Sequence, residues 1–414
     1  MKVLAIETSC DDTCISLIEG KKGKVEPKFR ILSNIVSPQV KIHRKYGGIY
    51  PTLAKREHQK NLVPVLKKAL KKAGLLRKIF LNCGAITKRR EAPTGSSFQT
   101  LKKILRGDSD LLKNLTKFLK IYQKPKIDAI AVTIGPGLEP CLWQGVNFAK
   151  SLSFWWNLPI IPANHIEAHI IANFLPKVSS NFQFSISNFQ NIFPAICLVV
   201  SGGHTQLILM NDIGKYKIIG ETRDDAAGEC FDKTARILGL GYPGGPAIDA
   251  EAAKNINSRF QIPDSIFQIK LPRPMLHSKN YDFSFSGLKT AVLYKVKNEK
   301  RKTKNKKYIR AMATEIQQAV IDVLISKTLK AAKNFKARTI ILGGGVAANN
   351  ELKKQFKSKI KKEIPNSLFL IPDSKFCTDN AAMIGATALL RWETKTTSWQ
   401  KIKANANLRI KYGL

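Results

Sequence analysis

Two histidines, His165 and His169, stand four residues apart in the stretch NHIEAH. Residues at positions i and i+4 of a helix lie on one face, so a helix here would hold both imidazoles side by side, as metal binding requires. The plainer interpretation is a pair of core or solvent-facing histidines. Two facts favour the metal: the pair directly follows the strand-like stretch Pro159–Pro162, and the chain has only six histidines. We therefore predict a metal site at the start of this helix.

A carboxylate that could complete such a site is Asp379, in the stretch Phe376–Ala382. This stretch is typical of an N-cap that starts a helix of small residues, and a capping Asp379 would need no other role. As a third ligand, it would make a site of two histidines and one carboxylate with open coordination positions. The sequence does not indicate a zinc peptidase, because Glu167 stands two positions after the first histidine, about 200° around the helix, rather than next to it.

Two glycine-rich turns have the composition of phosphate-binding loops. One ends the stretch Val199–Gly203, and the other, Gly343–Gly345, lies beside the expected start of a helix. Both could present backbone N–H groups to a phosphate, although glycine clusters usually only make turns. Each turn stands at a place that has a counterpart in the first half of the chain, which favours a nucleotide. The chain has no GxxxxGKS or GxxxxGKT motif, which excludes a Walker-type nucleoside triphosphatase.

An acid-rich run, Glu221–Lys233, leads into a double-glycine turn at Gly241–Pro246 and then Asp249. A helix N-terminus that favours acids accounts for the pair Asp224–Asp225. It accounts less well for Asp232 and for Asp249. Solvent-exposed acids without a function are a poor explanation for so many acidic residues together in so basic a chain.

The elements that must position these residues occur twice. In each half, an apolar strand, a small polar turn and a second strand are followed later by another strand that runs into a glycine turn and a helix. In the first half, the strand, turn and second strand are Val3–Ile6, Glu7–Asp12 and Cys14–Ile18, and the later strand is Ala129–Ile134. In the second half, the corresponding elements are Ala195–Val200, Ser201–His204 and Gln206–Met210, and the later strand is Thr339–Leu342. This order implies a duplicated α/β lobe with a ligand cleft between the two lobes, because ligands of α/β sheets bind at the carboxyl ends of strands.

We expect an N-terminal lobe over 1–177, a low-complexity linker over 178–191 and a C-terminal lobe over 192–414. A basic insertion at about 77–126 interrupts the first lobe before the strand that begins near Ile127. The insertion contains turn residues at Pro93–Ser97 and then one amphipathic helix over about 98–122.

Composition limits the class of protein. The chain has 414 residues, enough for two or three domains or one large two-lobed body, and 69 Lys and Arg against 30 Asp and Glu give a net charge of +39. This charge favours nucleic acid or an anionic membrane surface as a partner, although an AT-biased genome also produces lysine-rich chains. The apolar stretches are too short to span a membrane. Seven scattered cysteines without a CxxC motif indicate reduced thiols and a cytoplasmic protein.

Together these motifs resemble one family, the TsaD family of tRNA N6-adenosine threonylcarbamoyltransferases. The resemblance spans nearly the whole chain in order and leaves out mainly the insertion and the linker. It rests on ETSCDDT (Glu7–Thr13), HIEAH (His165–His169), SGGHTQL (Ser201–Leu207), DDAAGECFDK (Asp224–Lys233), GYPGGPAID (Gly241–Asp249), FSFSGLKT (Phe283–Thr290), GGVAAN (Gly344–Asn349) and CTDNAAMIG (Cys377–Gly385). It implies the two-lobed fold of sugar kinases, Hsp70 and actin, the ASKHA fold.

The resemblance also implies a reaction and its ligands. The family moves a threonylcarbamoyl group from threonylcarbamoyl-AMP to N6 of the adenosine 3′ to the anticodon, position 37, in tRNAs that read ANN codons, which forms t6A. It implies one divalent metal, with iron favoured over zinc, and as partners a paralogous subunit and a small ATPase. The residues it implies are His165, His169 and Asp379 for the metal, and Val199, Val200, Ser201, Gly202, Gly203, Asp232, Gly245, Asp249 and Asn349 for the adenylate.

The chemistry of that reaction points to one more residue. An exocyclic amine is a weak nucleophile, so a Lewis acid must polarise the carbonyl group and a base must take up the proton. Asp11, at the tip of the first hairpin, is our candidate base or orienting residue, and the alternative is a plain turn residue. Nucleophilic catalysis by Cys10 is not needed, because the mixed anhydride is already activated.

Some features depart from the family pattern. Thr52 stands where the family often has Glu, and Leu138–Trp143 replaces small apolar residues. The basic insertion is atypical, and we hypothesise that it adds phosphate contacts to tRNA. Two other functions stay open. An ATPase or small-molecule kinase of the same fold would turn over ATP steadily, and a non-catalytic tRNA-binding scaffold would tolerate the loss of Asp379 and Asp11.

Overall fold

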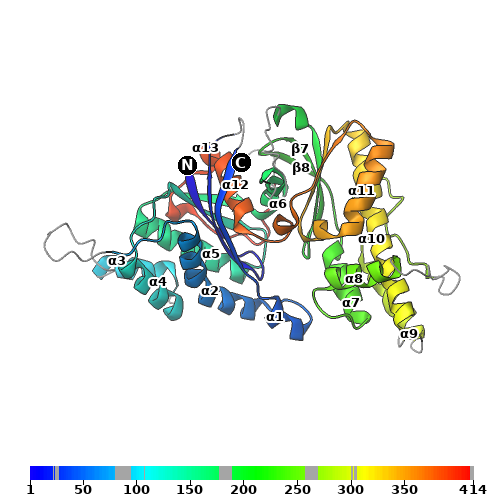
Figure 1. Ribbon diagram of the computed structural model, residues 1–414, viewed down its shortest axis with the longest axis horizontal. Coiled ribbons are helices and arrows are strands. Elements are labelled where there is room, and N and C mark those ends of the chain that lie inside the picture. The colour runs from blue at the N-terminus through cyan, green and yellow to red at the C-terminus, as the bar shows by residue number, and fades with distance from the viewer. Residues whose placement is uncertain are drawn as a thin grey trace. The chain divides into compact units, whose positions relative to one another are not determined.

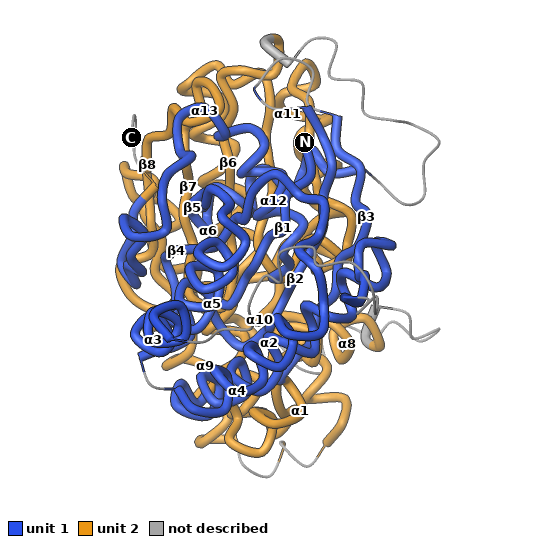
Figure 2. Tube along the Cα trace, turned by 90° about the vertical axis from the view of Figure 1, so that its left-hand side faces the viewer, with its two compact units in different colours: residues 1–39, 50–185, 379–409 blue, residues 40–49, 186–378, 410–414 orange. Residues whose placement is uncertain are grey.

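The computed structural model describes residues 1–21, 23, 28–79, 95–106, 108–176, 189–256, 269–299, 302 and 305–410. The chain divides into two compact units, whose elements are labelled in Figure 1 and which are coloured separately in Figure 2. The first comprises residues 1–39, 50–185 and 379–409, and the second comprises residues 40–49, 186–378 and 410–414. Residues 80–94 of the expected insertion and 178–188 of the expected linker lie outside the described residues.

The first unit is built on a five-stranded sheet in the order β3-β2-β1-β4-β5. β1 pairs antiparallel with β2 and parallel with β4, and β4 pairs parallel with β5. Because β1, β4 and β5 run in one direction, their last residues, Glu7, Gly135 and Asn164, lie at the same edge of the sheet. The strands are β1 (Lys2–Glu7), β2 (Thr13–Gly20), β3 (Phe29–Ser37), β4 (Ala129–Gly135) and β5 (Ile160–Asn164).

Helices cover both faces of this sheet, which is why β1 is apolar without alternation. Side chains of a strand alternate between the two faces, so Leu4 and Ile6 point one way and Ala5 the other. Leu4 and Ile6 share a core with α2 and α5, whereas Ala5 lies against α12. The helices of this unit, apart from those of the insertion, are α2 (Pro51–Lys72), α5 (Glu139–Trp156), α6 (His165–Ile171), α12 (Ala381–Leu390) and α13 (Trp392–Lys395).

Residues 379–409 belong to the first unit, although we expected them in a C-terminal lobe over 192–414. The reason is α12, which is apolar on every side and fully buried. Gly385 allows its close approach to the sheet, because a Cβ there would lie 2.3 Å from Ile18 Cγ2 and 3.3 Å from Ala5 Cβ. The Thr397 N–H then bonds the carbonyl of Ile160 at 3.0 Å. Chain order alone does not show that a segment returns to an earlier unit.

The insertion contains two described helices instead of the single helix predicted over about 98–122. They are α3 (Gly95–Ile104) and α4 (Ser109–Ile121). Arg106 between them has a φ of 52°, in the left-handed region that ends a helix. Asp108 then starts α4, because its side chain accepts a hydrogen bond from the Leu111 N–H at 3.1 Å.

The second unit repeats the same arrangement, with a five-stranded sheet in the order β10-β9-β6-β7-β8. β6 pairs antiparallel with β7 and parallel with β9, as β1 does with β2 and β4, which confirms the predicted duplication of an α/β unit. Across both units, no described helix combines the length and apolar character needed to cross a membrane. The elements are β6 (Ala195–Val200), β7 (Thr205–Asp212), β8 (Lys215–Glu221), β9 (Thr339–Gly343), β10 (Leu368–Leu370), α1 (Val40–His43), α7 (Ala227–Ile237), α8 (Gly244–Ile256), α9 (Ser286–Asn298), α10 (Lys306–Asn334) and α11 (Asn350–Glu363).

Candidate metal centre

The predicted helix of the two histidines is α6, which starts where β5 ends. The side chain of Asn164, the last residue of β5, accepts hydrogen bonds from the N–H groups of Ile166 at 2.8 Å and Glu167 at 3.1 Å. This cap fixes the first turn of the helix. His165 and His169 are both buried, and their ring centroids lie 4.6 Å apart. The i, i+4 spacing therefore places both imidazoles on one face, as predicted.

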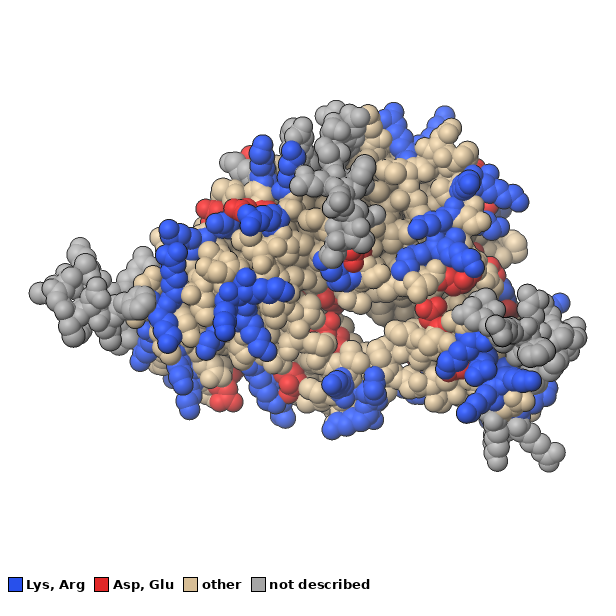
Figure 3. Space-filling model, in the orientation of Figure 1, with Lys and Arg blue, Asp and Glu red and all other residues tan. Residues whose placement is uncertain are grey.

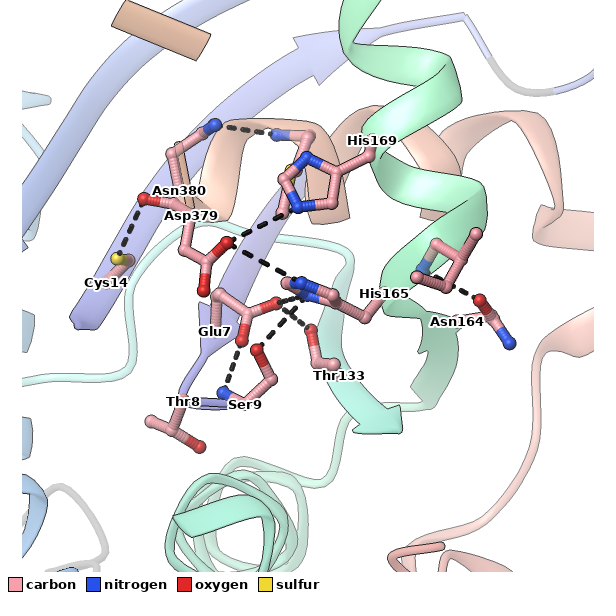
Figure 4. A network of polar contacts seen from close by, with 12 residues as sticks. Glu7, Thr8, Ser9, Cys14, Thr133, Asn164, His165, His169, Asp379 and Asn380 are labelled. Carbon is pink, nitrogen blue, oxygen red and sulfur yellow. Dashed lines mark hydrogen bonds and ion pairs between the residues drawn. The ribbon is translucent and has the colours of Figure 1, made fainter. Parts of the chain in front are cut away.

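Asp379 reaches the histidines from the residue before the cap of α12. The cap is Asn380, whose side chain accepts a hydrogen bond from the Met383 N–H at 3.1 Å, so the capping role considered for Asp379 belongs to its neighbour. Asp379 Oδ1 lies 3.5 Å from His165 Nε2 and 3.3 Å from His169 Nε2 (Figure 4). One possible ligand atom from each of the three residues lies within 4.8 Å of the others. The structure thus brings the three predicted ligands together.

Glu7, the last residue of β1, contacts the other side of the His165 ring (Figure 4). Its Oε2 lies 3.0 Å from His165 Nδ1 and accepts a hydrogen bond from Thr133 Oγ1 at 2.6 Å, while its Oε1 accepts one from the Ser9 N–H at 2.5 Å. A fully buried carboxylate beside Nδ1 favours a proton on that nitrogen, so Nε2, on the side of Asp379, is the nitrogen that would lose its proton to a metal. Metal-ligating histidines commonly have such a carboxylate partner.

The charges of this cluster suit a bound cation. Burial opposes the charged form of His165, but the carboxylates of Asp379 and Glu7 outweigh it and raise its pKa to about 9. Burial alone would raise the pKa of Glu7, yet His165 lowers it. Burial lowers the pKa of His169, and neither of its ring nitrogens makes a well-aligned hydrogen bond to a described residue. A buried imidazole of this kind, with a second imidazole and a carboxylate, fits a divalent metal such as iron or zinc.

The turn between β1 and β2 carries Asp11, the predicted candidate base, followed by Asp12. Both ends of this turn are held by His58, a buried residue of α2. Its Nε2 lies 3.1 Å from the carbonyl oxygen of Cys10, and its Nδ1 lies 2.8 Å from the hydroxyl of Thr13. Because a carbonyl oxygen only accepts hydrogen bonds, the Nε2 of His58 carries a proton. His58 therefore fixes the loop that presents the two acids.

Asp12 is an ionisable residue to which the sequence analysis gave no role. Burial, with the negative charges of Asp11 and Asp379, raises its pKa to about 8. Its Oδ1 is buried and has no hydrogen-bond partner in the described parts of the chain. A carboxylate with a pKa near neutral pH is well matched to general-base catalysis. The structure therefore adds Asp12 to Asp11 as a candidate base.

In the second unit, the predicted phosphate loop follows β6, which ends with Val199–Val200. Ser201 closes the turn, since its N–H donates to the His204 carbonyl at 2.8 Å and its Oγ accepts from the His204 N–H at 3.1 Å. At Gly202–Gly203, nothing lies within 4 Å of where a Cβ would stand, so this side of the backbone is open. Gly344 has a φ of 88°, and a Cβ there would lie 2.3 Å from the Val200 carbonyl oxygen. The two glycine turns therefore meet, and their contact requires glycine.

The other predicted adenylate residues are Asp232 of α7, Gly245 and Asp249 of α8, and Asn349 before α11. Asn349 caps α11 and donates from Nδ2 to Asp249 Oδ1 at 3.3 Å. Asp232 accepts a hydrogen bond from the Gly244 N–H at 2.6 Å, next to Gly245. Burial raises the pKa of both aspartates. The structure brings Asn349 and Asp249 together and ties Asp232 to the glycine turn that starts α8.

Comparison with known proteins identifies the family. The sequence profile described as "TsaD: tRNA N6-adenosine threonylcarbamoyltransferase" matches residues 30–80 and 109–386. A protein of that name from Persephonella marina is 37% identical over 414 residues, 99% of this chain and 96% of that protein. Another, from Geobacillus thermodenitrificans, is 40% identical over 408 residues, 98% of this chain and 95% of that one. The chain belongs to the TsaD family.

The predicted family is thereby confirmed, and the two matching five-stranded sheets agree with the duplicated α/β fold that the resemblance implies. The ROK hexokinase from Thermus thermophilus is a more distant solved structure, which superposes with a TM-score of 0.37 at 13% identity, over 95% of this chain and 99% of that one. The TsaD profile includes the three candidate ligands and α4, but it leaves out α3.

Sequence reasoning gave no role to Glu7, Asp12 or His58. Glu7 did leave a signal, because it is an acid directly after a buried apolar strand, at the edge where sites form. The signal of His58 is weaker. Ala54, His58 and Leu62 follow one another at intervals of four residues, so they lie on the same buried face of α2. Its partners come from another part of the chain, so its hydrogen bonds were not predictable.

Proposed function

We propose that this protein forms t6A by transferring the threonylcarbamoyl group of threonylcarbamoyl-AMP to N6 of adenosine 37, 3′ to the anticodon, in tRNAs that read ANN codons. The proposal is carried by the cluster of His165, His169 and Asp379, which lies in a chain that belongs to the TsaD family. The names of the relatives supply the reaction and its tRNA substrate.

The metal part of the proposal assigns three ligands. His165 Nε2, His169 Nε2 and Asp379 Oδ1 would hold one divalent ion and leave coordination positions open, and iron is favoured over zinc, as the family resemblance implies. When bound, the ion supplies a Lewis acid that polarises the carbonyl group of the substrate. Glu7 keeps a proton on His165 Nδ1, so that Nε2 is the nitrogen that would give up its proton and coordinate.

The transfer step exchanges one bond to the carbamoyl carbon for another. N6 of adenosine attacks that carbon and a C–N bond forms, while the C–O bond to the adenylate phosphate breaks and AMP leaves with its electron pair. N6 gives up one proton. Asp11 is the proposed acceptor of this proton, and Asp12, with a pKa of about 8, is the second candidate. His58 holds the loop that presents both carboxylates.

We assign adenylate binding to the second unit. The N–H groups along Val199–Gly203 would bind the phosphate, and the open backbone at Gly202–Gly203 supports this assignment. Asp232, Asp249 and Asn349 supply the polar groups that a nucleoside needs, and Gly245 follows Gly244, whose N–H bonds Asp232. The hydrogen bond between Asn349 and Asp249 orders both side chains before a ligand binds.

The partners and the compartment complete the proposal. The protein would act with a paralogous subunit and a small ATPase of the same pathway, as the family resemblance implies. A cytoplasmic location is supported by the described cysteines, which are all free thiols, Cys10, Cys14, Cys141, Cys197, Cys230 and Cys377.

A transfer assay tests the proposal. Purified protein, alone and with its partners, receives threonylcarbamoyl-AMP and unmodified tRNA, and the nucleosides are then analysed by mass spectrometry. We expect adenosine to gain the mass of a threonylcarbamoyl group. Steady ATP hydrolysis without a modified nucleoside would favour the ATPase or kinase alternative. Binding of tRNA by folded, metal-loaded protein without any product would favour the scaffold.

A further inference from the structure

The helix α4 is strongly two-sided. Its apolar residues, among them Leu115 and Phe118, are buried in the core of the first unit. Lys113, Lys117 and Lys120 are exposed, and their spacing of four and three residues places them in one row along the other face. The core contact explains why α4 is a helix, but it gives no reason for this row of lysines.

A second group of lysines lies beside this row. The C-terminal half of α2 exposes Lys67 and Lys68, and its last turn exposes Lys71 and Lys72. The two groups are neighbours, because Lys67 Nζ stands 5.5 Å from the ring centroid of Tyr122, the residue after α4. We call these residues the α2–α4 lysine face, which consists of Lys67, Lys68, Lys71, Lys72, Lys113, Lys117 and Lys120.

No described residue neutralises the charges of the α2–α4 lysine face by an ion pair, whereas Lys60, earlier on α2, pairs with Glu57 at 2.7 Å. The undescribed residues 80–94 contain a single acid, Glu91, beside Lys88 and two arginines. In Figure 3, drawn in the orientation of Figure 1, Lys and Arg crowd the side that carries α3 and α4, with few acids among them.

Helix stabilisation explains only part of this arrangement. Lysines in the last turn of a helix interact favourably with its dipole, which accounts for Lys71, Lys72 and Lys120. Lys113 and Lys117 lie outside the last turn, where that interaction has faded. Phe98, Leu112 and Ile121 line a groove beside the row and would offer apolar contacts to a protein, but the three lysines that share this lining favour an anionic partner.

We infer that the α2–α4 lysine face binds the phosphate backbone of tRNA. The inference rests on the proposed function, in which tRNA is the substrate, and it adds a surface on the first unit apart from the reacting residues. Lysine ammonium groups in a row neutralise successive phosphates and release counterions, which gives affinity without sequence preference. The face would therefore hold and orient the tRNA, while other residues choose the adenosine.

The test compares two triple variants of the full chain. The first, Lys113→Gln/Lys117→Gln/Lys120→Gln, removes the α4 row. The control, Lys357→Gln/Lys361→Gln/Lys362→Gln, removes the same charge from exposed positions of α11 in the second unit. Glutamine has nearly the helix propensity of lysine, so both variants should fold, which far-UV circular dichroism checks. The tRNA dissociation constant of each protein is measured between 50 and 200 mM KCl, on the order of the range where such contacts are salt-sensitive.

We expect the slope of log affinity against log salt to become shallower by about 1 for each lysine that contacts a phosphate, and the control to keep the wild-type slope. Equal slopes in the wild type and the α4 variant would overturn the inference. Equal losses in both variants would also overturn it, because they would indicate only the overall field of the protein. An α4 variant that keeps its tRNA affinity but no longer binds the paralogous subunit would overturn the inference as well.

This test separates the inference from the proposed function. A shallower salt slope in the α4 variant than in the wild type, together with no modified nucleoside from the wild type, would support the tRNA-binding surface and contradict the proposed function. Modified nucleoside made by an α4 variant with wild-type tRNA affinity would contradict the surface and support the proposed function.

Discussion

Glu7 Oε2 lies 3.0 Å from His165 Nδ1, although 158 positions separate the two residues in the chain. The sheet explains this proximity. β1 and β5 flank β4 and run parallel to it, so the end of β1 and the start of α6 lie at the same edge. Glu7 thereby sets which nitrogen of His165 is available on the side of Asp379.

We predict that Glu7→Gln weakens metal binding about 10- to 100-fold, as expected when the hydrogen-bond partner of a ligating histidine is changed. Glutamine fills the same volume but removes the charge that holds the proton on Nδ1. The affinity is measured by competition with a chelator. Glu139→Gln, an exposed acid of α5, serves as the control and should keep the wild-type affinity. Equal affinities of the two variants would show that Glu7 does not support the metal.

We predict that the metal-free protein loses stability as the pH rises from about 6.5 to 9. The pKa of His165 is raised from 6.5 to about 9 in the folded protein, so its charged form stabilises the fold below pH 6.5. That contribution, at most about 3–4 kcal/mol, is lost as the histidine deprotonates. Urea unfolding after chelator treatment measures it. The His165→Asn variant should lack this part of the pH dependence, and an identical pH dependence in both proteins would refute the assignment.

We predict that Asp11→Asn lowers the transfer rate by roughly 10²- to 10⁴-fold, the usual contribution of a general base. Asp12→Asn should have a smaller effect and should remove an inflection near pH 8 from the rate profile, because the pKa of Asp12 is raised to about 8. Single-turnover transfer rates between about pH 6 and 9 distinguish the two. The opposite ranking would make Asp12 the base.

We predict that Arg391→Met destabilises the protein by about 3–5 kcal/mol at most, the usual cost of breaking a buried ion pair. Arg391 Nε lies 3.7 Å from Glu167 Oε1, and both side chains are buried. This pair ties the end of α12 to α6. The double variant Glu167→Leu/Arg391→Met should recover most of the loss, and Lys401→Met, at an exposed position, should have almost no effect. Comparable unfolding free energies for Arg391→Met and Lys401→Met would contradict this account.

The sequence predicted those features that depend on local spacing. The i, i+4 pair of His165 and His169, the strand before it and the repeated strand–turn units are all set by neighbouring residues. The return of α12 to the first unit was not predictable, since it depends on packing such as Gly385 against Ile18. The break at Arg106 was missed because apolar residues recur at helical spacing on both sides of it. Glu7 and His58 act through hydrogen bonds to distant segments, which a single sequence does not reveal.

The measurement that tests the central claim most directly joins metal content to transfer in the same preparations. Wild type, His169→Ala, Asp379→Ala and the control His277→Ala, an exposed histidine of the second unit, are each assayed for bound metal and for single-turnover modification of tRNA. We predict one metal per chain and full activity in the wild type and the control. In the two ligand variants we predict little metal and a rate lower by about a thousandfold or more, since a Lewis acid contributes several kcal/mol to such a step. Wild-type transfer rates in folded, metal-free His169→Ala protein would contradict the account.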